Sequence, residues 1–331
     1  MIFNKPNTDG VAEIHALVGV SYYRNNDFAA IRPHIIDETR TVIKHIGRDV
    51  YDRAEKHYFD AYDPEFYSDR TEGADHTDDK LVNLIQTAIA LMAIFRYGQA
   101  NVLSHEDVGR KIKIDPDHEK LPWEWMYDRD DAAMLRRAYI AIDTLIEFLE
   151  NAKIEEWLQS QRRMECRSLL LATWQEFERV YPIDESPRFF YELTPFIREA
   201  QERWLPDAMT LNIYSNLQNR YIANAISSED DKRLLFLVQR YLPLRTIEIA
   251  CGRLSVSVFP EGIVQRFMDR NGQRNSRAAS DEARREYART IGKQADDALN
   301  DVKRFIQQIT AGDLLYPIMP KNDRNNKFFI A

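Results

Sequence analysis

The second half of this chain repeats the first, which restricts the fold to two similar units. Three segments recur in the same order: residues 28–35 match 190–197, residues 78–80 match 230–232, and residues 138–149 match 295–306. In the first pair an aromatic residue, an aliphatic residue, a proline and an isoleucine are all displaced by 162 positions. Repeats that keep their order predict an architecture that local propensity misses. We therefore expect two diverged copies of one unit.

Apolar residues recur at three-and-four spacing over most of the chain, which predicts α-helices. The clearest helix carries Leu81, Leu84, Ile85, Ala88, Ile89, Met92 and Phe95. Further helices are expected at about 27–46, 129–152, 154–179, 188–225, 229–251 and 280–311. In contrast, Leu254, Val256 and Val258 alternate with serines, a period of two that suits a strand. The fold class is therefore all-α, with a minor β element near 253–259.

The repeat divides the chain into two tandem helical bundles. We expect a first unit at 1–152, a bridging helix at 153–179, a second unit at 180–312 and a C-terminal tail at 313–331. A proline at the same place in both copies, Pro33 and Pro195, indicates a shared first helical turn. The bridging segment is too apolar for a free linker, so we expect it to pack on both units.

Composition narrows the class of protein. Hydrophobic residues make up 44% of the chain and charged residues 30%, as in a folded, soluble protein. The first ten residues lack a secretory signal, and no apolar stretch approaches the roughly 18 residues that span a bilayer. We therefore expect a cytoplasmic chain without a membrane partner. The net charge of −8 argues against tight, general DNA binding, although it allows DNA to pass. Cys166 and Cys251 have no metal-ligand or redox spacing and are expected to be buried hydrophobes.

The repeated residues also carry a family resemblance. Phe28, an aliphatic residue and Pro33-His34-Ile35 open a helix that runs toward Tyr51, and residues 157–160, 169–177 and 181–183 continue the pattern. In these segments the chain resembles a family of Bacteroidetes phage and prophage proteins of unassigned function. More distantly, in the apolar helix at 81–97, it is similar to the head–tail connectors of long-tailed phages. The second copy departs from the pattern, with Asp207-Ala208-Met209 where the first has Ile46-Gly47-Arg48.

The resemblance implies a structural protein of the virion, assembled in the host cytoplasm. Such a connector, or adaptor, forms a ring, commonly a dodecamer, between the portal protein and the tail or a further ring protein. DNA passes through its channel without sequence specificity. The alternative is a monomeric or dimeric helical protein with a binding or regulatory role. An enzyme is the third possibility, and we expect none.

The sequence contains no motif that would carry catalysis or hold a cofactor or metal. Asp115, Asp117 and Glu119 match a calcium loop only in part, because Lys120 replaces the required glycine. Asp75, His76, Asp78 and Asp79 precede an apolar helix, where capping is the expected role. Ser228 with Asp231, and Ser104 with Asp107, are likewise expected to cap helix starts.

Two segments are candidate contact sites. Arg266, Arg270, Arg274 and Arg277 belong to a dense basic stretch, expected to be either a solvated loop or a contact with an acidic neighbouring subunit or DNA phosphate. Phe328, Phe329 and Ile330 follow a polar tether and form an apolar tip, which either docks into a neighbouring subunit or frays.

Overall fold

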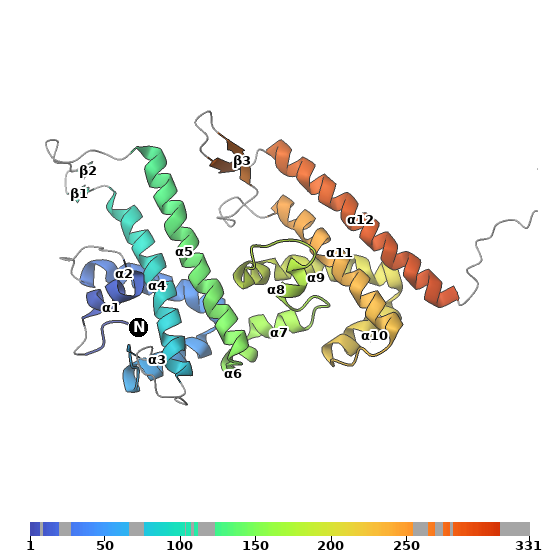
Figure 1. Ribbon diagram of the computed structural model, residues 1–331, viewed down its shortest axis with the longest axis horizontal. Helices are drawn as coiled ribbons and strands as arrows, with labels where there is room; N and C mark the ends of the chain where they lie inside the picture. The colour runs from blue at the N-terminus through green and yellow to red at the C-terminus, as the bar shows by residue number, and fades with distance from the viewer. Residues whose placement is uncertain are drawn as a thin grey trace, which may run out of the picture. The chain divides into compact units, whose positions relative to one another are not determined.

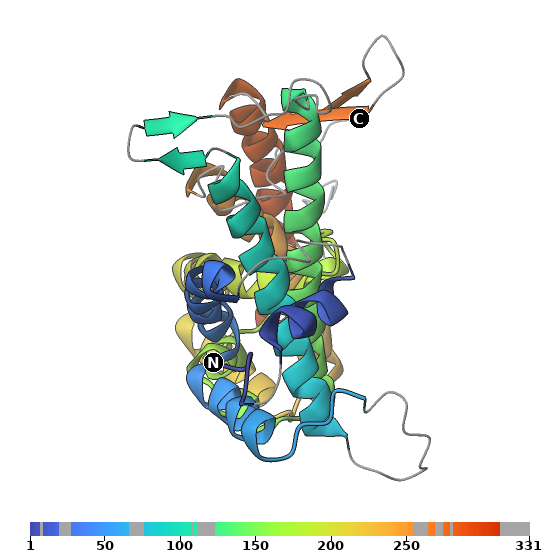
Figure 2. The ribbon, with the colours of Figure 1, turned by 90° about the vertical axis from the view of Figure 1, so that its left-hand side faces the viewer.

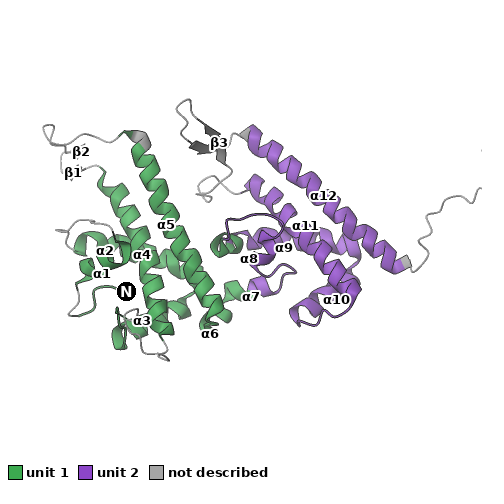
Figure 3. Cartoon of the chain, viewed as in Figure 1, with its two compact units in different colours: residues 1–164, 186–191 green, residues 165–185, 192–331 purple. Residues whose placement is uncertain are grey.

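The computed structural model describes the chain except for residues 7–8, 20–27, 66–75, 103, 107–108, 112–122, 254–263, 269–273, 279–280 and 312–331. Within the described residues the chain forms twelve α-helices and two antiparallel β-hairpins (Figure 1). The all-α prediction is confirmed. The chain divides into two compact units, residues 1–164 with 186–191 and residues 165–185 with 192–331 (Figure 3).

Unit 1 is a bundle around one apolar helix. Its elements are α1 (Gly10–Val18), α2 (Phe28–Ile46), α3 (Arg48–Asp60), α4 (Thr77–Asn101), β1 (Ser104–Glu106), β2 (Gly109–Lys111), α5 (Glu124–Asn151) and α6 (Glu155–Leu158). Helix α4 contacts α1, α2, α3 and α5, and buried side chains lie on all its faces between Leu81 and Phe95. A helix that is apolar all round is stable in water only when its neighbours cover it.

Helix α4 also has the length and composition of a membrane span. An 18-residue window within it has a mean hydropathy of 1.4, and 67% of that window is buried inside the fold. The expectation that no stretch approaches membrane length was therefore wrong for this helix. The burial by its neighbours is typical of a core helix in a folded unit.

Unit 2 repeats this order. Its elements are α8 (Trp174–Glu178), α10 (Leu211–Ile222), α11 (Glu229–Arg253), β3 (Val264–Met268), β4 (Arg274–Ala278) and α12 (Asp281–Ala311). Helices α7 (Gln161–Arg167) and α9 (Pro187–Met209) cross the unit boundary. Helices α11 and α12 pack along each other as α4 and α5 do in unit 1 (Figures 1 and 2). Each unit thus has two long paired helices with a β-hairpin between them in sequence.

The expected bridging helix at 153–179 is three short helices, α6, α7 and α8. The chain leaves the helical conformation at Leu169–Leu171, three buried leucines, and α8 then starts with a capping box at Thr173 and Glu176. Sequence alone did not separate these pieces, because their apolar residues also fit one continuous helical pattern.

The repeat begins earlier than the sequence matches indicated. In unit 1 the buried residues Ile2 and Phe3 lie against α4, where the Gln86 side chain donates to the Ile2 carbonyl at 2.6 Å. In unit 2 the matching Gln239 donates to the Leu170 carbonyl at 3.1 Å. We call residues 1–4 and 169–172 the first and second straps. Each strap precedes the first short helix of its copy.

A half-buried glutamate on the first short helix of each copy fixes the strap. Glu13 on α1 accepts from the Asn4 amide at 2.9 Å and from the Tyr58 hydroxyl at 2.8 Å. Glu176 on α8 accepts from the Ala172 amide at 2.9 Å and from the Tyr221 hydroxyl at 2.9 Å. Both the glutamates and the tyrosines are displaced by 163 positions. This side-chain correspondence shows that α8 is the counterpart of α1.

The break between the second and third helices of each copy uses the same backbone conformation. Gly47, between α2 and α3, has φ 90° and ψ 158°. Thr210, between α9 and α10, has φ 65° and ψ 148°. The sequence aligns Gly47 with the segment Asp207-Ala208-Met209, which lacks a glycine. In the structure the residue with the conformation of Gly47 is Thr210, one position after Met209.

Two local predictions differ from the structure. Ser104 and Asp107 were expected to start a short helix, but Ser104 pairs with Lys111 as the first residue of hairpin β1–β2. The β element expected near 253–259 lies outside the described residues from 254 onward, and Arg253 ends α11. By contrast, Ser228 does serve at the start of α11, since its hydroxyl accepts from the Asp231 amide at 3.4 Å.

Candidate functional site

Three of the four candidate arginines lie in a hairpin and not in a loop. Arg266 is on β3 and pairs in register with Ser276, while Arg274 pairs with Met268 and Arg277 with Gln265. Because successive strand positions alternate between faces, positions 266 and 274 share one face and position 277 lies on the other. Arg270 falls between the strands, outside the described residues. The first hairpin also carries basic residues, Arg110 and Lys111 on β2.

The other candidate contact, Phe328 to Ile330, lies outside the described residues, as do Asp115, Asp117, Glu119 and Asp75. In the parts of the chain that are described, no three His, Cys, Asp or Glu side chains are grouped so that they could hold a metal ion. Cys166 is buried, as expected, with its sulfur 3.2 Å from the Thr194 hydroxyl, whereas Cys251 is half-buried.

The acidic residues at the start of α4 join helices together. Asp78 pairs with Arg53 at 2.8 Å, and Asp79 lies 2.7 Å from His57 Nε2 and 3.1 Å from His76 Nδ1. Burial opposes ionisation of Asp79, but hydrogen bonds from both histidines and from the Asp63 amide lower its pKa. The N-cap residue, His76, makes no side-chain capping bond, whereas Asp78 and Asp79 lie in the first turn of the helix, where carboxylates favour the positive end of the helix dipole. In unit 2 Asp231 on α11 pairs with Arg220 on α10, the equivalent pair of helices.

A second polar cluster fixes the end of α5. Glu150 accepts from Trp157 Nε1 at 3.0 Å and from the Tyr191 hydroxyl at 2.9 Å, and it pairs with Arg163 at 2.7 Å. Nearer the N-terminus of the same helix, Asp143 accepts from the Ser186 hydroxyl and the Arg188 amide, both at 2.8 Å. Burial raises the pKa of Asp143 against these bonds. These contacts place residues 186–191 in unit 1.

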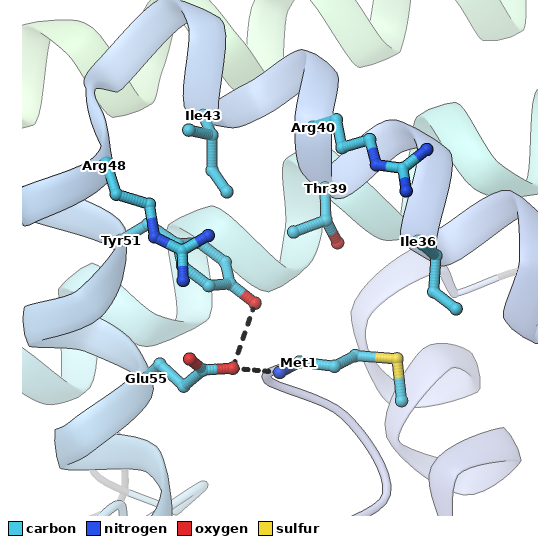
Figure 4. Close-up of a pocket in the computed structure, with 8 residues that line it drawn as sticks. All are labelled: Met1, Ile36, Thr39, Arg40, Ile43, Arg48, Tyr51 and Glu55. Carbon is cyan, nitrogen blue, oxygen red and sulfur yellow. Dashed lines mark hydrogen bonds and ion pairs between the residues drawn. The ribbon is translucent and has the colours of Figure 1, made fainter.

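A pocket lies on unit 1, between α2, α3 and the first strap (Figure 4). Its volume is about 230 Å³. Ile36, Thr39 and Ile43 on α2 and the Met1 side chain form its less polar side, and Arg40 and Arg48 stand at its edge. Ligand sites for small molecules are usually at least about 300 Å³, so this pocket suits a single protein side chain better.

Charged groups in this pocket are already paired with one another. The Glu55 carboxylate lies between the amino group of Met1 and the Tyr51 hydroxyl, with a Tyr51–Glu55 distance of 3.5 Å (Figure 4). Burial and the Glu55 charge raise the pKa of Tyr51 well above its usual value. Arg40 pairs with Asp37 at 3.3 Å and Arg48 with Asp52 at 2.8 Å. The pocket therefore offers apolar surface more than an unpaired charge.

A second exposed feature lies beside hairpin β1–β2. Large apolar side chains are exposed at the end of α4 and the start of α5, namely Val102, Trp123, Met126 and Tyr127, which we call the hairpin-end patch. The Gln99 side chain donates to Asp131 at 3.2 Å, so these two helix ends are adjacent. Trp123 is 70% exposed. Sequence reasoning missed this patch, although Trp123 directly after Leu121-Pro122 marks an aromatic residue at a helix start.

Comparison with known proteins gives one family. A model of a family of unknown function, DUF6712, matches residues 43–167 and 200–328. The two matched segments begin 157 positions apart, within the range of displacements between the copies. No curated protein and no solved structure matches the chain. Because the family model covers more than half of its residues, the chain belongs to the DUF6712 family of unknown function.

Proposed function

We propose that this protein is a non-enzymatic component of a phage particle, a head–tail connector or adaptor that forms a ring. The observation that carries the proposal is the doubled module: each unit joins two long packed helices through a β-hairpin. Two related but non-identical modules in one chain provide two similar surfaces for different partners. That arrangement suits a protein that joins the portal to the tail.

Three half-buried glutamates support a scaffold role. Glu13, Glu176 and Glu150 each accept hydrogen bonds from two or more segments of their own unit. A partly buried carboxylate that accepts from several segments holds them together, and removing it leaves those donors without their acceptor. Each of these glutamates therefore holds neighbouring segments of its unit in a fixed arrangement.

Self-association is supported by the hairpin-end patch. Exposed aromatic residues clustered beside a helix end are typical of protein interfaces, where tryptophan and tyrosine contribute much of the binding energy. The hairpins carry basic residues, while the whole chain has a net charge of −8. A basic hairpin therefore has complementary, acidic surface available on a second copy. The same arginines could contact DNA phosphates without reading sequence.

The finer assignment rests on the resemblance to connector proteins. It supports a portal-bound ring, commonly of twelve copies, in a virion assembled in the host cytoplasm, with DNA passing through the channel. The family match adds no activity, since the family itself is of unknown function.

The test is the mass of the native assembly. We expect the purified chain, alone or mixed with its portal protein, to form a closed ring visible by native mass spectrometry and negative-stain microscopy. Monomer in the presence of intact portal would refute the proposal. Such a monomer, or a dimer, would favour the alternative of a helical binding or regulatory protein.

One variant links the ring to the patch. Trp123→Glu should reduce ring formation at least about tenfold, because loss of an interface tryptophan commonly costs 2 kcal/mol or more. Ile140→Glu is the matched control, since Ile140 is 55% exposed on the same helix but distant from the hairpin. Equal assembly by both variants would remove the patch from the interface.

A further inference from the structure

We propose that the pocket of unit 1 receives the apolar segment Phe328–Phe329–Ile330 of a neighbouring copy. This inference rests on the proposed function in one respect, namely that copies of the chain associate with one another. Its basis is the comparison of equivalent faces in the two units.

In unit 2 the face equivalent to the pocket is covered by the unit's own chain. Arg198 pairs with Glu165 at 3.7 Å, the Thr194 hydroxyl lies 3.2 Å from Cys166, and Gln218 donates to the Ser168 carbonyl at 2.7 Å. Glu165, Cys166 and Ser168 belong to the end of α7 and the residue just after it, directly before the second strap. The chain that leads into the strap thus covers this face.

Among the described residues of unit 1, no segment covers the matching positions in this way. Displacement by 162 takes Arg198 to Ile36 and Thr194 to Arg32, and displacement by 163 takes Gln218 to Glu55. Ile36 and Glu55 line the pocket, and Arg32 is exposed where Thr194 is buried. The repeated unit therefore has a covered face in one copy and an open, partly apolar pocket in the other.

Size and chemistry indicate the occupant. A pocket of about 230 Å³ with isoleucine and methionine side chains in its lining suits an aromatic or aliphatic side chain. The sequence places two phenylalanines and an isoleucine directly after the polar stretch 321–327. The sixteen residues from 312 to 327 span at most about 55 Å, which allows the segment to reach another copy. Such anchoring of a short apolar segment is a common mode of subunit contact.

Site-specific crosslinking in the full chain tests this. Phe329 is replaced by p-benzoylphenylalanine in a ¹⁵N-labelled copy, which is mixed with unlabelled wild-type chain, irradiated and analysed by peptide mass spectrometry. We expect crosslinks from position 329 to peptides containing residues 36–55 of the other isotope. As the control, p-benzoylphenylalanine replaces Tyr316 instead, and we expect no crosslinks from that position to residues 36–55.

Two variants of the unlabelled receiving copy define the pocket. Ile36→Glu should lower the crosslinking yield about tenfold, because it places a charge where an apolar side chain would be buried. Phe59→Glu, at a 50% exposed position on α3 that does not line the pocket, should leave the yield unchanged. Circular dichroism on both variants controls for folding.

Each outcome decides the matter. Mixed-isotope crosslinks to the pocket that Ile36→Glu removes would support the inference. Crosslinks confined to one isotope, or directed elsewhere on the chain, would overturn it. The mass of the same samples separates the two proposals: a ring without pocket crosslinks refutes only this inference, and mixed crosslinks without a ring refute only the connector function.

Discussion

Thr210 has a backbone conformation that favours glycine. Its φ of 65° and ψ of 148° lie close to a region that is occupied almost only by glycine, and its counterpart in the first copy is Gly47. The threonine side chain makes no capping hydrogen bond at the start of α10. The second copy therefore has a strained residue with little local compensation.

Thr210→Gly should stabilise the protein by about 1 kcal/mol. Relief of strain of roughly 1–3 kcal/mol outweighs the 0.5–1 kcal/mol by which glycine favours the unfolded chain. Urea denaturation measures the change, with Thr210→Ala as the control that keeps a Cβ atom and should gain nothing comparable. A glycine variant less stable than wild type would show that the threonine is not strained.

His45 stays uncharged among cations. Its Nδ1 lies 3.2 Å from the Arg162 guanidinium, which also donates to the Lys44 carbonyl at 3.1 Å. Burial, followed by Arg162 and Arg188, lowers the pKa of His45 to about 3. Since the unfolded value is near 6.5, the unfolded chain binds a proton below that pH which the folded chain does not.

Acidification should therefore destabilise the fold through His45. Between pH 7 and 5.5 wild type should lose about 1 kcal/mol from this group, and the loss should continue toward pH 3. In His45→Gln, whose amide oxygen can still accept from Arg162, this part of the loss should be absent. Denaturant titrations of both proteins at several pH values provide the test, and parallel curves would contradict the assignment.

At the scale of elements, each strap depends on one glutamate. Glu176 accepts from the Ala172 and Thr173 amides, the Tyr221 hydroxyl and the Gln239 side chain, the last at 3.1 Å. Glu13 accepts from the Asn4 amide and the Tyr58 hydroxyl. The second strap therefore has more donors on its carboxylate than the first.

Glu176→Gln should cost about 2 kcal/mol, because an amide nitrogen would face groups that donate. Glu13→Gln should cost less, since fewer donors converge there. Glu229→Gln, at an 88% exposed side chain, is the control and should change stability by less than about 0.5 kcal/mol. Melting curves in which Glu13→Gln loses more stability than Glu176→Gln would refute this account of the straps.

The main helices could be predicted from sequence, whereas the straps and hairpins could not. Helix α4 has an apolar pattern long enough to predict both its type and its burial. Ile2-Phe3 and Leu169–Leu171 are too short for a pattern, and their role depends on Gln86 and Gln239, distant in sequence. Hairpin β3–β4 consists largely of polar residues, so no alternation of apolar residues indicates its strands.

At the scale of the molecule, the repeat was predictable but the candidate site was not. The pocket combines Met1, Ile36 and Glu55, which only the folded strap and helices bring together. It also depends on a difference between the copies, because the chain before the second strap covers the face that remains open in unit 1. A sequence match between the halves indicates the elements that they share. It does not indicate that a face covered in one copy is open in the other.

The crossing of the chain between units has an evolutionary consequence. Ser186 and the first residues of the second copy's α9, up to Tyr191, bond to Asp143 and Glu150 of unit 1, while residues 165–185 belong to unit 2. No single cut of the polypeptide separates the two units intact. A gene that reverted to one copy would remove hydrogen-bond partners of Asp143 and Glu150, so the fusion is hard to reverse, and selection can then diversify the halves without their separating again.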